Sequence, residues 1–315
     1  MSKIKVVSYM SGIPFNNKNL EKPRVLYNFI ESVKANGDIG IVHTGFDIID
    51  CDVAVIQGFV HEHGKLLPHL NLRKTVIERQ IARGRRSIII DSNLFLYRDK
   101  YNSCGYLRYS YDGVFPNTGE YCNANPDPSR WETIRNNIGF NLKPWRENGK
   151  HILICLQRNG GWSMKGLNVV DFFKQITTEI RKYSDRPIIV RTHPGDKRSS
   201  QYVNSLIGKN VSISVNEKLD HDLNNAWASV VYNSSPSVAS VIEGIPTFVI
   251  DPTYSQTAEV ANLDISKIET PTLFDRSKWI QKLAQCHWND YDLTSGAAWK
   301  HMKDWAIYDP NSLRF

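Results

Sequence analysis

The stretch Val230–Pro252, VVYNSSPSVASVIEGIPTFVIDP, constrains the fold more than any other part of the chain. Val230–Tyr232 and Thr247–Ile250 have the β-branched and aromatic character of short buried strands. Between them the pattern predicts a helix that runs to about Glu243 and is ended by Gly244 and the proline that follows. Strand, helix, strand is the repeating unit of α/β folds with a parallel sheet.

The predicted helix begins on three polar residues, Asn233, Ser234 and Ser235. Small side chains and unpaired backbone N–H groups at such a helix start favour a bound anion such as a diphosphate. An ordinary αβ unit with a polar cap has the same residues, so this stretch alone leaves both interpretations open.

A second motif lies about forty residues earlier in the chain. Pro187–Val190 is a short apolar strand that leads into Arg191, His193 and Pro194. Side chains at the carboxyl end of a parallel strand lie where open α/β sheets bind ligands. Both motifs therefore predict ligand-binding residues at the same edge of one sheet.

The order of these motifs resembles the donor half of GT-B glycosyltransferases, and is most similar to bacterial capsule, sialic-acid and Kdo transferases. The matching positions are His193, Pro194, Ser234, Ser235, Gly244 and Pro246. The resemblance implies an α/β fold of two Rossmann-like domains facing across a cleft. It also implies that the histidine and the serines hold the nucleotide and phosphate of a sugar donor. Ala239 stands where many relatives carry a ribose-binding glutamate, and Glu243, one turn further on, is the candidate to replace it.

A loop after the predicted strand His151–Gln157 completes the candidate donor site. It contains Arg158, Gly160 and Gly161, and the GT-B group often lines its donor crevice with a loop at this place. A plain glycine turn is the alternative. The predicted donor-binding residues are Arg158, Gly160, Gly161, Arg191, His193, Pro194, Asn233, Ser234, Ser235, Ser237 and Glu243.

The N-terminal half also predicts alternating strands and helices. The predicted elements are strands at Lys3–Tyr9, Asp52–Gln57 and Arg86–Ile90, and helices at Arg24–Ala35 and Leu70–Arg83. Asp91 follows the third strand, and a carboxylate at this edge suits the base that glycosyl transfer needs. A capping role in the next turn is the alternative for Asp91.

The layout of this half is similar to that of the phage β-glucosyltransferase that glucosylates hydroxymethylcytosine in DNA. In that enzyme a strand, a GK-containing loop, a helix and a further strand precede the catalytic aspartate. The resemblance implies that Asp91 is the catalytic base and that loops of the first domain meet the acceptor. The acceptor-side candidates are Ser11, Gly12, His61, Glu62, His63, Lys65 and Asn93.

Length and composition limit the number of domains and the kinds of binding partner. A chain of 315 residues with 41% hydrophobic content suits two domains. We expect an acceptor domain over residues 1–146, a nucleotide-sugar domain over 147–286, and a C-terminal helix over 287–315 that packs back on the first domain. The net charge of +7 favours a polyanionic partner, although many cytosolic enzymes are equally basic.

Several features are missing from the sequence. The absence of a long apolar run and of a signal peptide predicts no membrane insertion and a cytoplasmic location, in the host if the gene is phage-encoded. Five scattered cysteines predict no disulfide and no structural zinc. No DxD pair lies in a suitable loop, so we expect no metal and no prosthetic group.

These features predict an inverting, metal-independent glycosyltransferase with a nucleotide sugar as cosubstrate. A UDP-sugar is favoured, and a CMP-sugar stays open. The expected acceptor is a 5-hydroxymethylated pyrimidine, such as 5-hydroxymethylcytosine, in phage DNA. A capsule or surface saccharide is the alternative acceptor, and a non-catalytic module that binds nucleotide or nucleic acid is the second alternative. The oligomeric state is not predicted.

Overall fold

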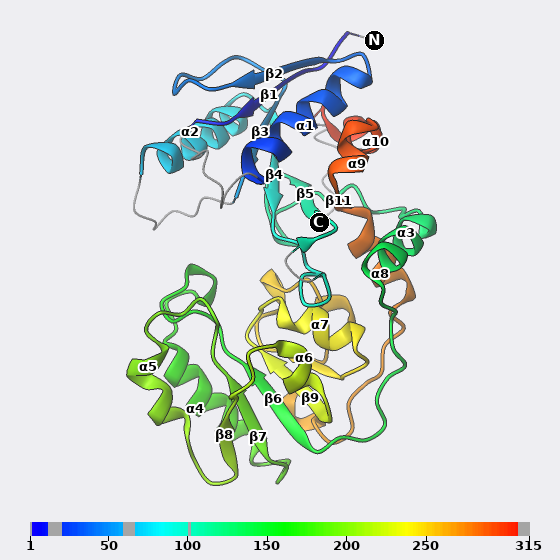
Figure 1. Ribbon diagram of the computed structural model, residues 1–315. Helices are drawn as coiled ribbons and strands as arrows, with labels where there is room; N and C mark the ends of the chain where they lie inside the picture. The colour runs from blue at the N-terminus through cyan, green and yellow to red at the C-terminus, as the bar shows by residue number, and fades with distance from the viewer. Residues whose placement is uncertain (1, 12–20, 59–66, 100–101, 308–315) are drawn as a thin grey trace. The chain divides into compact units, whose positions relative to one another are not determined.

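The computed structural model describes residues 2–11, 21–58, 67–99 and 102–307, and it divides into two compact units (Figure 1). Unit 1 comprises Met1–Asn93, Tyr101–Ile134 and Gln281–Phe315, and unit 2 comprises Leu94–Lys100 and Arg135–Ile280. The boundary between Ile134 and Arg135 falls inside helix α3 (Pro128–Ile138), and the boundary between Ile280 and Gln281 falls inside helix α8 (Ser277–Gln285). The sequence favoured boundaries after residues 146 and 286 instead. Each unit is described by itself below.

Unit 1 contains a sheet of strand order β11-β5-β4-β3-β1-β2. Its strands are β1 (Lys5–Tyr9), β2 (Ile39–His43), β3 (Val53–Gln57), β4 (Arg86–Asp91), β5 (Leu107–Tyr111) and β11 (His287–Trp288). Strands β2, β1, β3 and β4 are parallel, and β5 is antiparallel to β4. Because β11 is antiparallel to β5, it runs again in the direction of β4.

Helices cover both faces of this sheet (Figure 1). The helices are α1 (Glu21–Ala35), α2 (Pro68–Ala82), α9 (Asp290–Thr294) and α10 (Ala297–Met302). Alternate strand residues point to opposite faces. Ile88 and Ile90 therefore pack in the core with Phe29 of α1, whereas Ile89 packs with Val76 of α2. The result is a three-layer α/β/α arrangement.

Unit 2 contains a fully parallel sheet of order β10-β9-β6-β7-β8. Its strands are β6 (His151–Cys155), β7 (Ile188–Arg191), β8 (Val211–Ile213), β9 (Ala226–Val231) and β10 (Thr247–Val249). Its helices are α4 (Val169–Ile180), α5 (Ser199–Tyr202), α6 (Leu219–Leu223) and α7 (Pro236–Ile242). Ile152 and Ile154 pack with Phe172 of α4 on one face, and Leu153 packs with Ala239 of α7 on the other.

Short 3₁₀ helices occur in both units. They are η2 (Trp162–Met164), η3 (Val203–Leu206), η4 (Pro252–Tyr254), η5 (Ala258–Val260), η6 (Ile265–Lys267) and η7 (Lys303–Trp305). All but η7 lie in unit 2.

The predicted class of two α/β domains is confirmed, and the local differences have tertiary causes. The sequence predicts a helix over Leu219–Trp227, but α6 ends at Leu223, because Ala226–Val231 forms β9 and pairs with β6 and β10. Strands β2, β5 and β11 were not predicted. The last has only two residues, and its pairing partner in β5 lies far away in the sequence.

Candidate functional site

The strand order of unit 2 indicates where on its sheet a ligand would bind. The chain goes from β6 to β7 and β8 on one side, and then to β9 and β10 on the other side of β6. The loops after β6 and β9 therefore diverge at the carboxyl edge. Open α/β sheets bind ligands in the crevice at such a point.

Arg158 and His193 lie close together at this edge, after β6 and β7. A Cβ atom on Gly195 would lie 2.7 Å from Arg158 Nη2 and 3.2 Å from His193 Cε1, so both side chains crowd the same glycine. Within the described residues, the Arg158 guanidinium has no hydrogen-bond or ion-pair partner in the protein. Burial, and then the charge of Arg158, lowers the pKa of the His193 imidazole, which therefore stays neutral near pH 7.

A buried carboxylate that the sequence analysis did not select holds this loop pair together. Asp196 accepts hydrogen bonds from Asn159 N at 2.9 Å, Tyr202 Oη at 2.7 Å and Arg198 N at 2.9 Å. The bond from Asn159 joins the loop after β6 to the loop after β7. Gly160 has a φ of +70°, which allows the turn that follows.

The polar residues after β9 have three different environments. Asn233 donates through Nδ2 to Ser163 O at 3.0 Å and to Asp251 Oδ2 at 3.2 Å, so its side chain fixes the loop. The Ser234 hydroxyl oxygen is buried and has no hydrogen-bond partner among the described residues. Ser235 is exposed at the start of α7 and makes no capping bond with its side chain.

Ser237 is fully buried and is the second residue of α7. Its hydroxyl donates to Ser234 O at 2.8 Å, so it closes the turn before the helix. Because α7 has only seven residues, the serine groups before it, and not its dipole, are the candidate anion-binding feature.

Two of the predicted donor-binding residues, Arg191 and Glu243, form ion pairs with other residues of the protein. Arg191 donates to Asp222 Oδ2 at 2.5 Å, to Asn216 O at 2.7 Å and to Glu217 O at 2.7 Å. Glu243 is 6% exposed and accepts from Arg98 Nη2 at 2.5 Å and from Lys143. Both side chains therefore stabilise unit 2, and their predicted contacts with the donor stay predictions.

Asp251 and Lys165 are two further candidate site residues that the sequence reasoning did not select. Asp251 follows β10, is buried, and lies 3.1 Å from Lys165 Nζ, while Lys165 also lies over the ring of Tyr254. The signal was available, because Asp251 follows an apolar strand in the same way that Asp91 does.

In unit 1, Asp91 lies at the carboxyl end of β4 and pairs with a buried arginine. Its Oδ2 atom lies 2.6 Å from Arg108 Nη2, and the Arg108 side chain is 5% exposed. Asn93 donates to Asn102 Oδ1 at 3.0 Å, and the buried Ser11 hydroxyl donates to Gly45 O. Four further candidates after β3, namely His61, Glu62, His63 and Lys65, and also Gly12, lie outside the described residues.

No group of three or more His, Cys, Asp or Glu residues within the described ranges has the geometry of a metal site. A search of the same residues finds no helix long and apolar enough to span a membrane.

Comparison with solved structures identifies the class of fold. Two structures of KpsC from Thermosulfurimonas dismutans match over nearly the whole chain. The β-Kdo 2,7 transferase has a TM-score of 0.53 and 13% identity, with 93% of this chain and 98% of that chain covered. The β-Kdo 2,4 transferase has a TM-score of 0.55 and 12% identity, with 95% and 99% covered. Neither a protein-family profile nor a curated protein sequence matches the chain.

The chain therefore has a GT-B, glycosyltransferase-like fold, and the resemblance inferred from the two motifs is confirmed at the level of the fold. Both matching structures are named as Kdo transferases, so the comparisons favour the saccharide alternative. These two matches do not support the DNA acceptor expected from the sequence.

Proposed function

We propose that the protein is a glycosyltransferase that moves a sugar from a nucleotide-sugar donor to a hydroxyl group of a saccharide acceptor. The observation that carries the proposal is a set of polar groups that follow three adjacent strands at the carboxyl edge of the unit 2 sheet. They are the Arg158 guanidinium after β6, the neutral His193 imidazole after β7, whose Nδ1 accepts from Gly195 N, and the buried Ser234 hydroxyl after β9. The shared fold with two Kdo transferases supports the same activity.

The donor would bind through its phosphate groups. Arg158 is exposed and unpaired among the described residues, so it can form charge-assisted hydrogen bonds with a phosphate. Ser234 and Ser235 offer hydroxyl groups on the other side of the switch point, and His193 offers a neutral ring N–H. The same contacts stabilise the negative charge that grows on the departing nucleotide. They do not distinguish a UDP-sugar from a CMP-sugar.

The chemistry follows as a direct displacement. The acceptor oxygen forms a bond with the anomeric carbon while the bond from that carbon to the nucleotide phosphate breaks, which inverts the configuration. The acceptor proton passes to a base, for which Asp91 remains the candidate. No metal is part of this scheme.

The test is a transfer assay on the full-length protein. UDP- and CMP-sugars are combined with an oligosaccharide panel and with duplexes that contain cytosine or 5-hydroxymethylcytosine, and nucleotide release and product mass are measured. We expect transfer to a saccharide that persists in EDTA. A mass increase confined to the hydroxymethylated duplex would restore the DNA acceptor. The absence of both transfer and donor hydrolysis would support a binding module instead.

His193 provides the first mutational test. His193→Ala should weaken nucleotide binding about tenfold, because it removes one hydrogen bond to the donor. His221→Ala, which changes an exposed histidine of α6, is the matched control and should bind normally. Calorimetry on both variants gives the affinities. An unchanged nucleotide affinity in His193→Ala excludes His193 from the donor site.

A further inference from the structure

Unit 1 contains a pocket of about 240 Å³ that the donor site does not use. Val25 of α1 and Leu107 of β5 line it and are buried, so they form an apolar floor. The loop before β5 lines one side with residues 102–105, and polar side chains from α1 and from the start of α9 line another side, namely Arg24, Asn289 and Asp290.

The pocket lies at the ligand-binding edge of the unit 1 sheet. Leu107 is paired with Trp288, and the next residue, Arg108, is paired with Asp91 at the carboxyl end of β4. Strand β11 runs in the direction of β4, so Asn289 follows its carboxyl end directly. The pocket is therefore built from chain that leaves the carboxyl edge near Asp91, where α/β sheets place ligands.

The polar rim offers both donors and acceptors at short range. Arg24 Nη2 lies 2.5 Å from Asp290 Oδ2, and both side chains are partly exposed. Asn28 donates to the other oxygen of Asp290 at 3.4 Å. Asn289 uses its Oδ1 to cap α9, and its amide NH₂ has no hydrogen-bond partner among the described residues.

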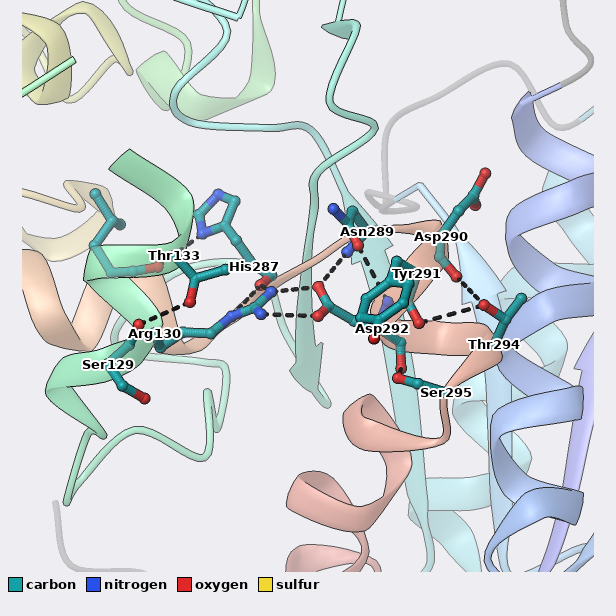
Figure 2. Close-up of polar contacts among 11 residues, drawn as sticks. Ser129, Arg130, Thr133, His287, Asn289, Asp290, Tyr291, Asp292, Thr294 and Ser295 are labelled. Atoms are coloured by element: carbon teal, nitrogen blue, oxygen red, sulfur yellow. Dashed lines mark hydrogen bonds and ion pairs between the residues drawn. The ribbon is translucent and has the colours of Figure 1, made fainter. Parts of the chain in front are cut away.

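An aromatic side chain completes the rim. Tyr291 is 78% exposed although it lines the pocket, so its ring is open to a ligand. Figure 2 shows Asn289, Asp290 and Tyr291 in succession where the chain enters α9.

We propose that this pocket binds one neutral sugar ring of the acceptor saccharide. The proposal rests on the proposed function and names the acceptor class. An apolar floor and an exposed tyrosine suit the C–H faces of a pyranose, and the Arg24–Asp290 pair suits neighbouring hydroxyl groups. The charges of Arg24 and Asp290 cancel, so this pair offers no net charge to favour an acidic sugar over a neutral one. The volume is below the roughly 300–1,000 Å³ of pockets for drug-sized ligands, which suits a single ring.

Direct binding to the full chain tests the proposal without donor. The probes are methyl glycosides of glucose, galactose, mannose and N-acetylglucosamine, with a methyl ulosonic acid glycoside and the nucleoside of 5-hydroxymethylcytosine beside them. Saturation-transfer NMR reports binding. We expect at least one neutral glycoside to bind. Binding of none of them, or of only the acidic sugar or only the nucleoside, overturns the proposal.

Paired variants locate the bound sugar. Asp290→Asn and Tyr291→Ala should each weaken glycoside binding about tenfold, since each removes one principal contact. Glu31→Gln and Tyr27→Ala change an exposed carboxylate and an exposed tyrosine of α1 outside the pocket and should bind normally. Equal affinity in all four variants places the sugar elsewhere and overturns the assignment.

Cys104 supplies an independent readout, because it lines the pocket and is partly exposed while the other four cysteines are buried. A bound glycoside should slow the alkylation of Cys104 by iodoacetamide, and an unchanged rate contradicts the proposal. Nucleotide binding is measured on the same samples. Nucleotide binding without glycoside binding overturns only the pocket, and glycoside binding without nucleotide binding overturns only the proposed function.

Discussion

The Asp91 carboxylate compensates a buried cation, and this contact limits what it can do as a base. Arg108 is 5% exposed at its side chain, and its Nε atom is buried without a hydrogen-bond partner among the described residues. A proton on Asp91 would leave the guanidinium with no counter-charge. The structural and the catalytic role of Asp91 must therefore be separated by experiment.

Asp91→Asn should lower the free energy of unfolding by on the order of 3 kcal/mol, because it leaves a buried arginine uncompensated. If Asp91 is the base, turnover should also fall by about a hundredfold or more. The double variant Asp91→Asn/Arg108→Met removes both charges and should regain most of the stability without regaining turnover. Urea unfolding and kcat measure the two effects. Activity that returns in the double variant shows that the base is another residue.

At the scale of elements, α7 is held in place by segments that lie close to it in space but far from it in the sequence. Glu243 at its C-terminus binds Arg98 and Lys143, which come from two segments more than ninety residues away in the chain. Gly244 has a φ of +75°, and a Cβ there would lie 1.9 Å from Pro144 O. Only glycine fits this backbone and this approach, so the segment around Pro144 packs directly on the end of α7.

The Glu243 contacts predict a pH dependence of stability. Burial alone raises the pKa of the Glu243 carboxyl, but hydrogen bonds from Lys143 and Arg98 outweigh it and hold the pKa below 4.5. A pKa that is lower in the folded than in the unfolded state stabilises the fold at higher pH. This contribution is lost as the pH falls through the folded value.

Glu243→Gln should therefore be less stable than the wild type at pH 7 and should lose less further stability between about pH 5 and 3. Urea titrations across this range measure the difference. Glu179→Gln, at an exposed pair with Lys182, serves as the control and should follow the wild type. If Glu243→Gln and the wild type lose stability equally steeply as the pH falls, the lowered pKa of Glu243 does not contribute to the acid sensitivity of the fold.

At the scale of the whole molecule, the chain leaves unit 1 in α3 and returns to it in α8. A buried ion pair within unit 1 joins the outgoing and the returning chain (Figure 2). Arg130 donates to Asp292 through Nη1 at 2.9 Å and Nη2 at 2.5 Å, and through Nε to His287 O at 3.1 Å. Its guanidinium also stacks 4.3 Å from the ring centre of Trp288. This contact holds β11 and α9, and with them one side of the proposed sugar pocket.

Asp292→Asn should lower the stability of unit 1 by about 3–5 kcal/mol, because it leaves Arg130 buried and unpaired. Glu31→Gln at an exposed pair should change it by less than about 1 kcal/mol. Hydrogen exchange followed by mass spectrometry should show the loss in residues 281–307 and in α3. A loss of protection from exchange that is confined to unit 2 would argue against a role of the Arg130–Asp292 pair in stabilising unit 1.

The sequence by itself determined most of the element types and the two α/β sheets, although not the strands β2, β5 and β11. Residues such as Ile88–Ile90 and Val230 carry the apolar patterns of buried strands, and Gly244 and Pro246 end a helix through local backbone sterics. These patterns involve residues that are close together in the sequence, so they can be recognised without knowledge of the tertiary structure. The sequence also predicts that Arg158, His193 and Ser234 follow strands at one edge of the sheet, because the carboxyl ends of parallel strands meet there.

Only the tertiary structure decided the partners of the charged residues. Asp91 meets Arg108, Arg191 meets Asp222, and Glu243 meets Arg98, and no local pattern encodes these pairs. The two-residue strand β11 likewise depends on its pairing with β5, and the rim of the pocket beside it depends on Asp290 meeting Arg24, some 260 residues earlier in the chain. Long-range packing selects such contacts through burial and charge compensation, which appear only once the sheets have formed.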